Sequence, residues 1–189
     1  MAKNKIKIPE DLSPEVLKLC QVLNEEDDYP CILLSTSFLE QVLGTLLASC
    51  MVRCEQTVTL LDPSGPLESL GARANAAYCL GLIPYRMWQN IDMIRTIRND
   101  LAHSYFNIGF KDQTVKDRCM NLHLPIPTTV VSIGSNNKDT HDSSYENNPR
   151  NRFTYVVLMM ANRILLTALG KSSKEIPPAQ GKEWYGQAT

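Results

Sequence analysis

The chain has 189 residues, of which 43% are hydrophobic, and a formal net charge of −1 at pH 7. This length suits one domain with a sizeable core. The near-neutral charge argues against the broad basic surface that drives nonspecific binding to duplex nucleic acid, so we do not expect direct binding to duplex DNA.

The N-terminal end predicts no targeting segment. Residues 1–12 form a short basic and then acidic leader, without the apolar stretch of a signal peptide. Along the whole sequence, no apolar run approaches the ~20 residues that a helix needs to cross a bilayer. We therefore expect a cytoplasmic protein that does not contact a membrane.

The six cysteines lie mostly within apolar segments, where thiols behave as small core residues. Cys50 and Cys54 are one helical turn apart, but no second pair of Cys or His has the spacing of a zinc site. The glycine-rich patterns that cradle phosphates are also missing from the sequence. We expect reduced, buried cysteines, no metal and no cofactor.

The first part of the chain predicts two helices. Ser13 and Pro14 have the order of an N-cap and a first helical proline, which indicates a helix to about Leu23. A long helix follows from Asp28 to about Arg53. Its apolar residues cover so much of the circumference that we expect burial on more than one side, as the central core helix or as part of a dimer interface.

A loop and a third helix come next. Two prolines and a glycine between residues 60 and 67 exclude a continuous helix and predict a structured loop. The third helix is expected over Leu67–Leu80, with Tyr78 among its inward residues. Gly81 is its natural C-terminal stop, because glycine accepts the left-handed conformation found there.

The second half of the chain predicts further helices around one long loop. A helix begins at Pro84, a short one covers Asp112–Leu122, and an amphipathic one covers Arg150–Leu169. Residues 123–149 are polar and form a long loop with a strand-like stretch at 128–133. Residues 170–189 are a peripheral tail. The predicted fold is a single all-α domain, an up-and-down bundle of about five helices.

The stretch Ile91–Tyr105 within the helix that begins at Pro84 carries the candidate chemistry. Its apolar residues recur at helical spacing and predict one buried stripe, made of Trp88, Ile91, Ile94, Ile97 and Leu101. A second, polar face stacks Asp92, Arg95, Asn99 and His103. Arg98 lies about 140° around an ideal helix from His103, so the two meet only through the long arginine stem or a second chain.

An arginine, an amide and an imidazole gathered in a cleft suit phosphoryl chemistry. The guanidinium neutralises a phosphate, the imidazole moves a proton near neutral pH, and the amide orients either one. A polar helix face is, on composition alone, more often a solvated surface or a paired network. The spacing favours the chemical interpretation: Arg98, Asn99 and His103 resemble the R-x4–6-H signature of the HEPN superfamily of small α-helical domains.

A wider block resembles the mannitol operon repressor (MltR-like) family. Its pattern G-P-L-x-x-L-x-x-R-x-x-x-x-x-x-L-G-x-I is matched by Gly65, Pro66, Leu67, Leu70, Arg73, Leu80, Gly81 and Ile83. The resemblance covers roughly residues 30–170. The sequence contains no recognition helix rich in Arg, Lys, Asn or Gln, so the family name does not lead us to expect direct operator binding.

The two resemblances imply different functions. Active HEPN members are metal-independent endoribonucleases that work as dimers, which implies an RNA-cutting toxin or phage-defence effector and an antitoxin as a partner. In such a homodimer His103 would be the general acid/base, Arg98 would bind the scissile phosphate and Asn99 would orient them. The expected supporting or RNA-binding residues are Asp92, Arg95, Tyr105 and Arg152. The alternative is a non-catalytic MltR-like transcriptional regulatory protein that acts through a protein partner.

Overall fold

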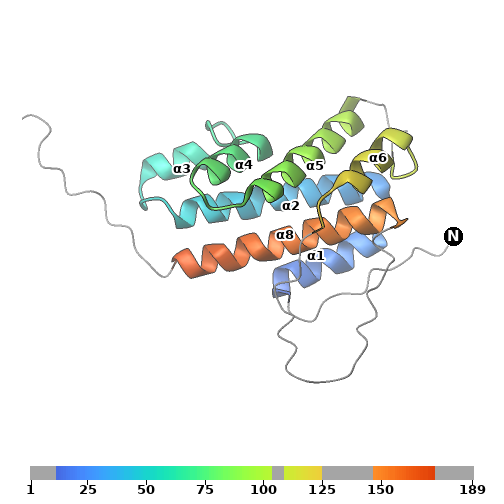
Figure 1. Cartoon of the computed structure of the whole chain (residues 1–189). Helices are drawn as coiled ribbons and strands as arrows, with labels where there is room; N and C mark the ends of the chain where they lie inside the picture. Colours follow the sequence, from blue (N-terminus) through green and yellow to red (C-terminus); the bar gives the residue numbers. More distant parts are fainter. Residues whose placement is uncertain (1–11, 104–108, 125–146, 173–189) are drawn as a thin grey trace, which may run out of the picture.

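The computed structural model describes residues 12–103, 109–124 and 147–172. Within these ranges every regular element is a helix, so the all-α prediction is confirmed. The helices are α1 (Pro14–Glu25), α2 (Asp28–Ser49), α3 (Glu55–Leu61), α4 (Leu70–Cys79), α5 (Tyr85–His103), α6 (Gln113–Asn121) and α8 (Pro149–Ser172) (Figure 1). The expected strand at 128–133 lies outside the described residues. The expected tail began at residue 170, but α8 continues to Ser172, and the rest of the tail lies outside the described residues.

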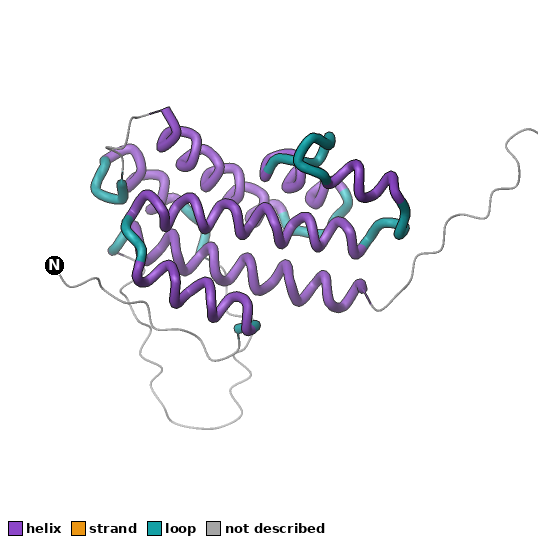
Figure 2. Tube along the Cα trace, turned by 180° about the vertical axis from the view of Figure 1, so that it is seen from behind, coloured by secondary structure: helices purple, strands orange, loops and turns teal. Residues whose placement is uncertain are grey.

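Helix α2 lies at the centre of the bundle and contacts α1, α3, α4, α5 and α8. Helices α1 and α8 run along one side of α2, while α4 and α5 lie on the other side (Figures 1 and 2). The prediction that this helix is buried on more than one side is therefore confirmed. Since its neighbours all belong to the same chain, that burial needs no second copy.

Helices α2 and α8 carry most of the apolar length of the chain. By length and composition alone, α2 and Pro149–Lys171 of α8 would each also suit a membrane span, with mean hydropathies of 1.6 and 1.5. About half of each window is buried inside the bundle, 50% and 56%. Such burial is what the core helices of a bundle show.

The ends of α1 and α4 follow their capping residues. Ser13 Oγ accepts a hydrogen bond from the Val16 N–H at 3.4 Å, and Pro14 is the first residue of α1, as predicted. After α4 the chain turns at Gly81, which has a φ of +67°. The Gly81 N–H donates to the Tyr78 carbonyl and the Leu82 N–H to the Ala77 carbonyl, each at 2.9 Å. This is a Schellman C-cap, and it confirms the predicted stop.

The predicted end of the second helix is wrong. Helix α2 ends at Ser49 and not at Arg53, and a separate seven-residue helix, α3, follows from Glu55. Beyond Ser49 the side chains are no longer buried, and no residue of α3 is buried. With few core contacts there is little tertiary packing to extend the helix, so the chain breaks and restarts.

Tyr78 is a second correction, because it is exposed and not inward, whereas Leu70, Ala74 and Ala77 of the same helix are buried as expected. The predicted core stripes of α1 and α8 are largely confirmed. The buried stripes include Val16, Leu19, Cys20 and Leu23 of α1 and Phe153, Val156, Val157, Met160 and Ile164 of α8. The two stripes place α1 and α8 against the same core.

Candidate functional site

Helix α5 positions the candidate site. Its apolar stripe faces the core, and Ile91, Ile94 and Ile97 are fully buried while Leu101 is almost so. Trp88, one turn earlier, is half-buried against the same core. This packing fixes the rotation of the helix and thereby directs Arg95, Arg98 and Asn99 away from the core.

Arg98 and Asn99 line an open groove with a volume of about 490 Å³, which we call the Arg98 groove. Its walls come from α2, from the segment before α4 and from the first turn of α4. The lining residues are Thr36, Ser37, Glu40, Pro63, Glu68, Ser69, Leu70, Gly71, Arg73, Arg95, Arg98 and Asn99. The structure therefore brings three of the predicted site residues, Arg95, Arg98 and Asn99, into one concave surface.

The guanidinium of Arg95 is held by a carboxylate of its own helix. Its Nε and Nη2 donate to Asp92 Oδ1 at 3.0 and 2.7 Å. The stem of Arg95 lies against the start of α4, where a Cβ added to Gly71 would be 3.1 Å from Arg95 Cδ. The ion pair largely neutralises the charge that Arg95 brings to the groove.

Arg98 is held much more weakly than Arg95. Its side chain is exposed. Its Nη1 donates to the neutral side chain of Asn99, and the distance to Oδ1 is a long 3.4 Å. A guanidinium in this position keeps most of its donors for an anionic group that enters the groove.

His103 and Tyr105 complete the predicted set only in part. His103 is the last residue of α5, but its side chain is not among those described, and Tyr105 lies outside the described residues. Along α5 the backbone keeps the helical phase between positions 98 and 103. Both positions therefore lie within one regular helix, where residues five apart are separated by about 140° around the axis.

Arg152 does not line the Arg98 groove. It is on α8, and its Nε and Nη2 donate to the Leu122 carbonyl at the end of α6, at 3.2 and 2.7 Å. Nearby, the side-chain amide of Asn90 donates to the His123 carbonyl and accepts from the His123 N–H, both at 2.8 Å. Arg152 and Asn90 thus hold the end of α6 against α8 and α5.

Arg73 has a structural role that the sequence did not reveal. Its Nε, Nη1 and Nη2 donate to the carbonyls of Leu67, Glu40 and Leu61 at 2.7, 2.8 and 2.7 Å. These bonds hold the loop before α4 against α2. The signal in the sequence was the arginine of the family pattern, which follows the loop at a fixed spacing. The predictions assigned it no role.

Glu40 contributes to the same wall of the groove. Its Oε2 accepts a hydrogen bond from the Leu70 N–H at the start of α4, at 3.0 Å. A carboxylate at a helix N-terminus is favourable because it meets the positive end of the helix dipole. Glu40 therefore fixes the start of α4 on α2.

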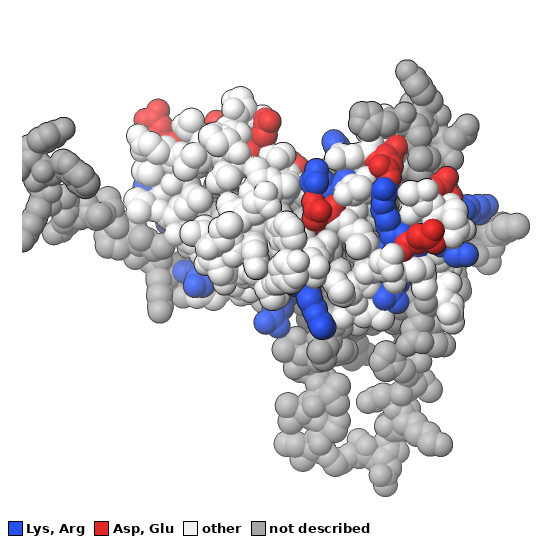
Figure 3. Space-filling view, turned by 45° about the horizontal axis from the view of Figure 1, so that its top comes forward, with Lys and Arg blue, Asp and Glu red and all other residues white. Residues whose placement is uncertain are grey.

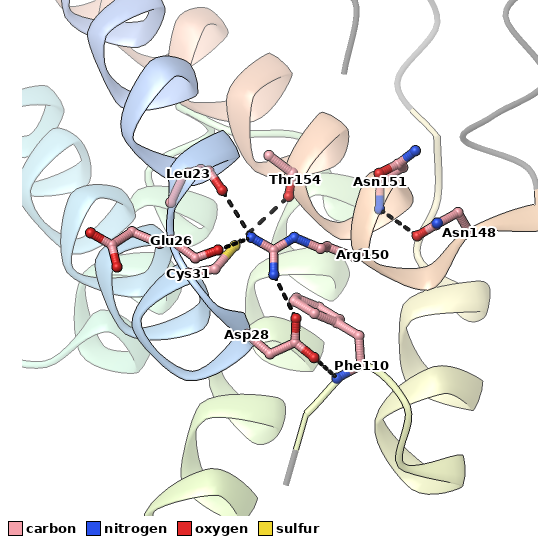
Figure 4. A network of polar contacts seen from close by, with 9 residues as sticks. All are labelled: Leu23, Glu26, Asp28, Cys31, Phe110, Asn148, Arg150, Asn151 and Thr154. Carbon is pink, nitrogen blue, oxygen red and sulfur yellow. Dashed lines mark hydrogen bonds and ion pairs between the residues drawn. The ribbon is translucent and has the colours of Figure 1, made fainter. Parts of the chain in front are cut away.

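Arg150 is a second residue whose role the sequence did not reveal (Figure 4). Its Nη1 donates to Asp28 Oδ1 at 2.5 Å, and its Nη2 donates to the Leu23 and Glu26 carbonyls at 3.0 and 2.5 Å. Asp28 Oδ2 accepts from the Phe110 N–H at 3.0 Å. We call this set the Arg150 network. It joins the end of α1, the start of α2, the start of α8 and the segment before α6.

The cysteines divide into buried and exposed thiols. Burial raises the pKa of the Cys20 and Cys31 thiols and raises the pKa of Cys119 to about 12. Cys54 is exposed, and hydrogen bonds from Thr57 lower its pKa. Cys54 and Cys79 thus differ from the predicted buried set. Within the described ranges no group of three or more His, Cys, Asp or Glu side chains has the arrangement of a metal site.

Comparisons with known proteins agree with the wider of the two resemblances. A family model described as MtlR, mannitol repressor, matches residues 18–170. The fold is similar to a chain in the X-ray structure of the MtlR–HPr complex from Escherichia coli, with 19% identity and a TM-score of 0.62, over 81% of this chain and 99% of that one. It is also similar to the crystal structure of a possible transcriptional regulator, YggD from Shigella flexneri 2a, with 18% identity and a TM-score of 0.61, over 83% and 99%. No curated protein matches the sequence.

Proposed function

Because the chain belongs to the mannitol repressor family, we propose that it is a non-catalytic transcriptional regulatory protein that acts by binding a protein partner. The observation that carries this proposal is the extent of the family match, residues 18–170, which includes most of α1 and nearly all of α8. The nuclease alternative has support only from one end of α5. The Escherichia coli relative in complex with HPr is the precedent for a protein partner.

The arrangement of the arginines also supports a role without nucleic acid. Arg73, Arg150 and Arg152 donate to main-chain carbonyls, and Arg95 is paired with Asp92. Guanidinium groups held in this way neutralise fewer phosphates than their number suggests. The net charge of −1 also argues against a broad surface for binding nucleic acid.

The direct test is a titration of the purified protein with purified HPr from the same organism by isothermal calorimetry. We expect saturable binding that is retained when nucleic acid has been digested away. A titration without measurable heat at ~100 µM of both proteins, a concentration that detects weak complexes, would contradict HPr as the partner.

The second candidate is a metal-independent endoribonuclease of the HEPN type, a toxin or defence effector that an antitoxin would silence. It is favoured by the weakly held guanidinium of Arg98, which lies beside Asn99 in a groove. In this hypothesis, Arg98 binds the scissile phosphate, His103 moves the proton and Asn99 orients them. Asp92 and Arg95 would support the site as a pair, while Tyr105 and Arg152 would contact RNA.

Because Arg98 and His103 lie about 140° apart on one helix, this chemistry requires a homodimer in which two α5 helices combine. The assay is cleavage of single-stranded RNA in EDTA by wild type, Arg98→Ala and His103→Ala, with Arg163→Ala as an exposed control on α8. Cleavage that only the two α5 variants lose would establish the nuclease and refute the regulatory proposal. If the wild type leaves a panel of RNAs intact, the endoribonuclease candidate is excluded.

A further inference from the structure

Two exposed tyrosines, an exposed leucine and a half-buried tryptophan lie together where α4 turns into α5. Tyr78 is 40% exposed, Leu80 59% and Tyr85 53%, and Trp88 is half-buried beside them. The ring centroids of Tyr78, Tyr85 and Trp88 are all 5.7 to 5.8 Å from one another. We call these four residues the aromatic patch. It explains why Tyr78 does not face the core, as its helical spacing had predicted.

Hydrogen bonds within the chain hold the aromatic patch in place. Trp88 Nε1 donates to Asn75 Oδ1 at 2.8 Å, which ties α5 to α4. The Schellman bonds at Gly81 fix the turn that carries Leu80. A surface that is already ordered loses little conformational entropy when it is covered, and tyrosine and tryptophan are the residue types that dominate interface centres.

The surroundings of the aromatic patch have little charge. In the view of Figure 3, acidic and basic side chains gather over the later part of α5 and over α6, whereas the surface over α4 and the start of α5 is nearly free of them. Arg86 is an exposed cation beside Tyr85. The patch therefore has an uncharged centre with a cation at its rim.

We propose that the aromatic patch is the contact surface for a second copy of this chain. In a two-fold contact, each residue near the axis meets its own counterpart, so a charged centre would place like charges together. The uncharged patch avoids this repulsion. A two-fold contact at the other end of α5 would not avoid this repulsion, because that end carries Arg95 and Arg98.

The size of the patch fits the centre of such an interface. Tyr78, Leu80 and Tyr85 expose on the order of 300 Å² of side-chain surface, about a third of the ~800 Å² that one partner contributes to a standard interface. The energetically dominant residues of an interface usually occupy a central fraction of this size. This assignment does not depend on the regulatory proposal, because it concerns self-association and not HPr.

The test is the molar mass in solution, measured by light scattering over roughly 10 to 100 µM, the range of moderate self-association. Wild type is expected at twice the 21.2 kDa chain mass. Leu80→Lys should be a monomer at every concentration, because two lysines would face each other across the axis. A lysine at the C-terminal end of α4 agrees with the helix dipole, so the fold should be retained. Tyr85→Ala, a second variant, should weaken the dimer at least tenfold.

Leu169→Lys is the matched control, since Leu169 is 67% exposed near the C-terminal end of α8 and is not part of the patch. It should remain a dimer. A wild type that is monomeric throughout would overturn the proposal, as would a dimer that survives in both patch variants. If wild type is a monomer and Leu80→Lys loses binding to HPr, the patch belongs to the protein partner and the proposal is equally wrong.

Discussion

Replacing Arg150 by alanine should destabilise the fold strongly, although the residue lies in the first turn of α8. The guanidinium bridges Asp28 and the carbonyls of Leu23 and Glu26, and it lies 5.7 Å from the centre of the Phe110 ring. The substitution therefore removes three charge-assisted hydrogen bonds. It also removes the only cation paired with Asp28 among the described residues.

The expected cost follows from these three bonds. At the lower end of the range for bonds to charged groups, about 1.5 kcal/mol each, the three bonds would contribute about 4.5 kcal/mol to the free energy of unfolding. The side chains of Arg150 and Asp28 are 21% and 33% exposed, so water compensates part of this loss. We therefore expect about 3 kcal/mol, which for a chain of this size lowers Tm by about 6 to 12 °C.

The assay is urea unfolding followed by circular dichroism at 222 nm, with Arg163→Ala as the control. Arg163 is on the same helix and exposed, so its loss should change the free energy of unfolding by no more than about 0.5 kcal/mol. Equal losses in the two variants would refute the role of the Arg150 network. A double-mutant cycle with Asp28→Asn should give a coupling energy of about 1 kcal/mol or more.

Three further outcomes follow from single residues. Gly81→Ala should lower the free energy of unfolding by about 1 kcal/mol, because alanine is strained at a φ of +67°. The added methyl itself has free space. Thermal unfolding measures this loss. At pH 8 a thiol reagent should label Cys54 before Cys119, as mass spectrometry of the labelled protein would reveal. The pKa of Cys119 rises from 9.0 to about 12 on folding, so its contribution to stability is complete below pH 9 and is lost as pH rises toward 12. Between pH 8 and pH 10, the free energy of unfolding of the wild type should therefore fall more than that of Cys119→Ala, as denaturant unfolding curves at the two pH values would measure.

The features that the sequence predicted correctly are those set by neighbours along the chain. The N-cap at Ser13, the stop at Gly81 and the buried stripe of α5 each depend on residues within two helical turns. Apolar spacing also predicted correctly that α2 is buried on more than one side. The same rule placed Tyr78 inward, because periodicity cannot distinguish a core contact from an aromatic patch at the surface.

The features that the sequence did not reveal depend on distant partners. Arg73 reaches carbonyls 6, 12 and 33 positions away, and Arg150 reaches a carbonyl 127 positions away. No local pattern distinguishes such an arginine from a solvated one. In the candidate site, spacing correctly grouped Arg95 with Asp92. It separated Arg98 from that face, although Arg98 lines the same groove as Arg95 and Asn99. Arg152 was expected at the same site but does not line this groove.

The position of the aromatic patch along α5 bears on the two candidate functions. Trp88 and Arg98 are ten residues apart, about 15 Å along the helix. A two-fold axis that crosses α5 at right angles near Trp88 makes the paired helices antiparallel, so the two Arg98 residues move to opposite ends of the dimer. The proposed nuclease instead needs the C-terminal ends of both α5 helices together, because positions 98 and 103 are about 140° apart around an ideal helix. Self-association through the patch in this orientation therefore favours the regulatory protein and leaves the Arg98 groove of each copy open to a separate partner.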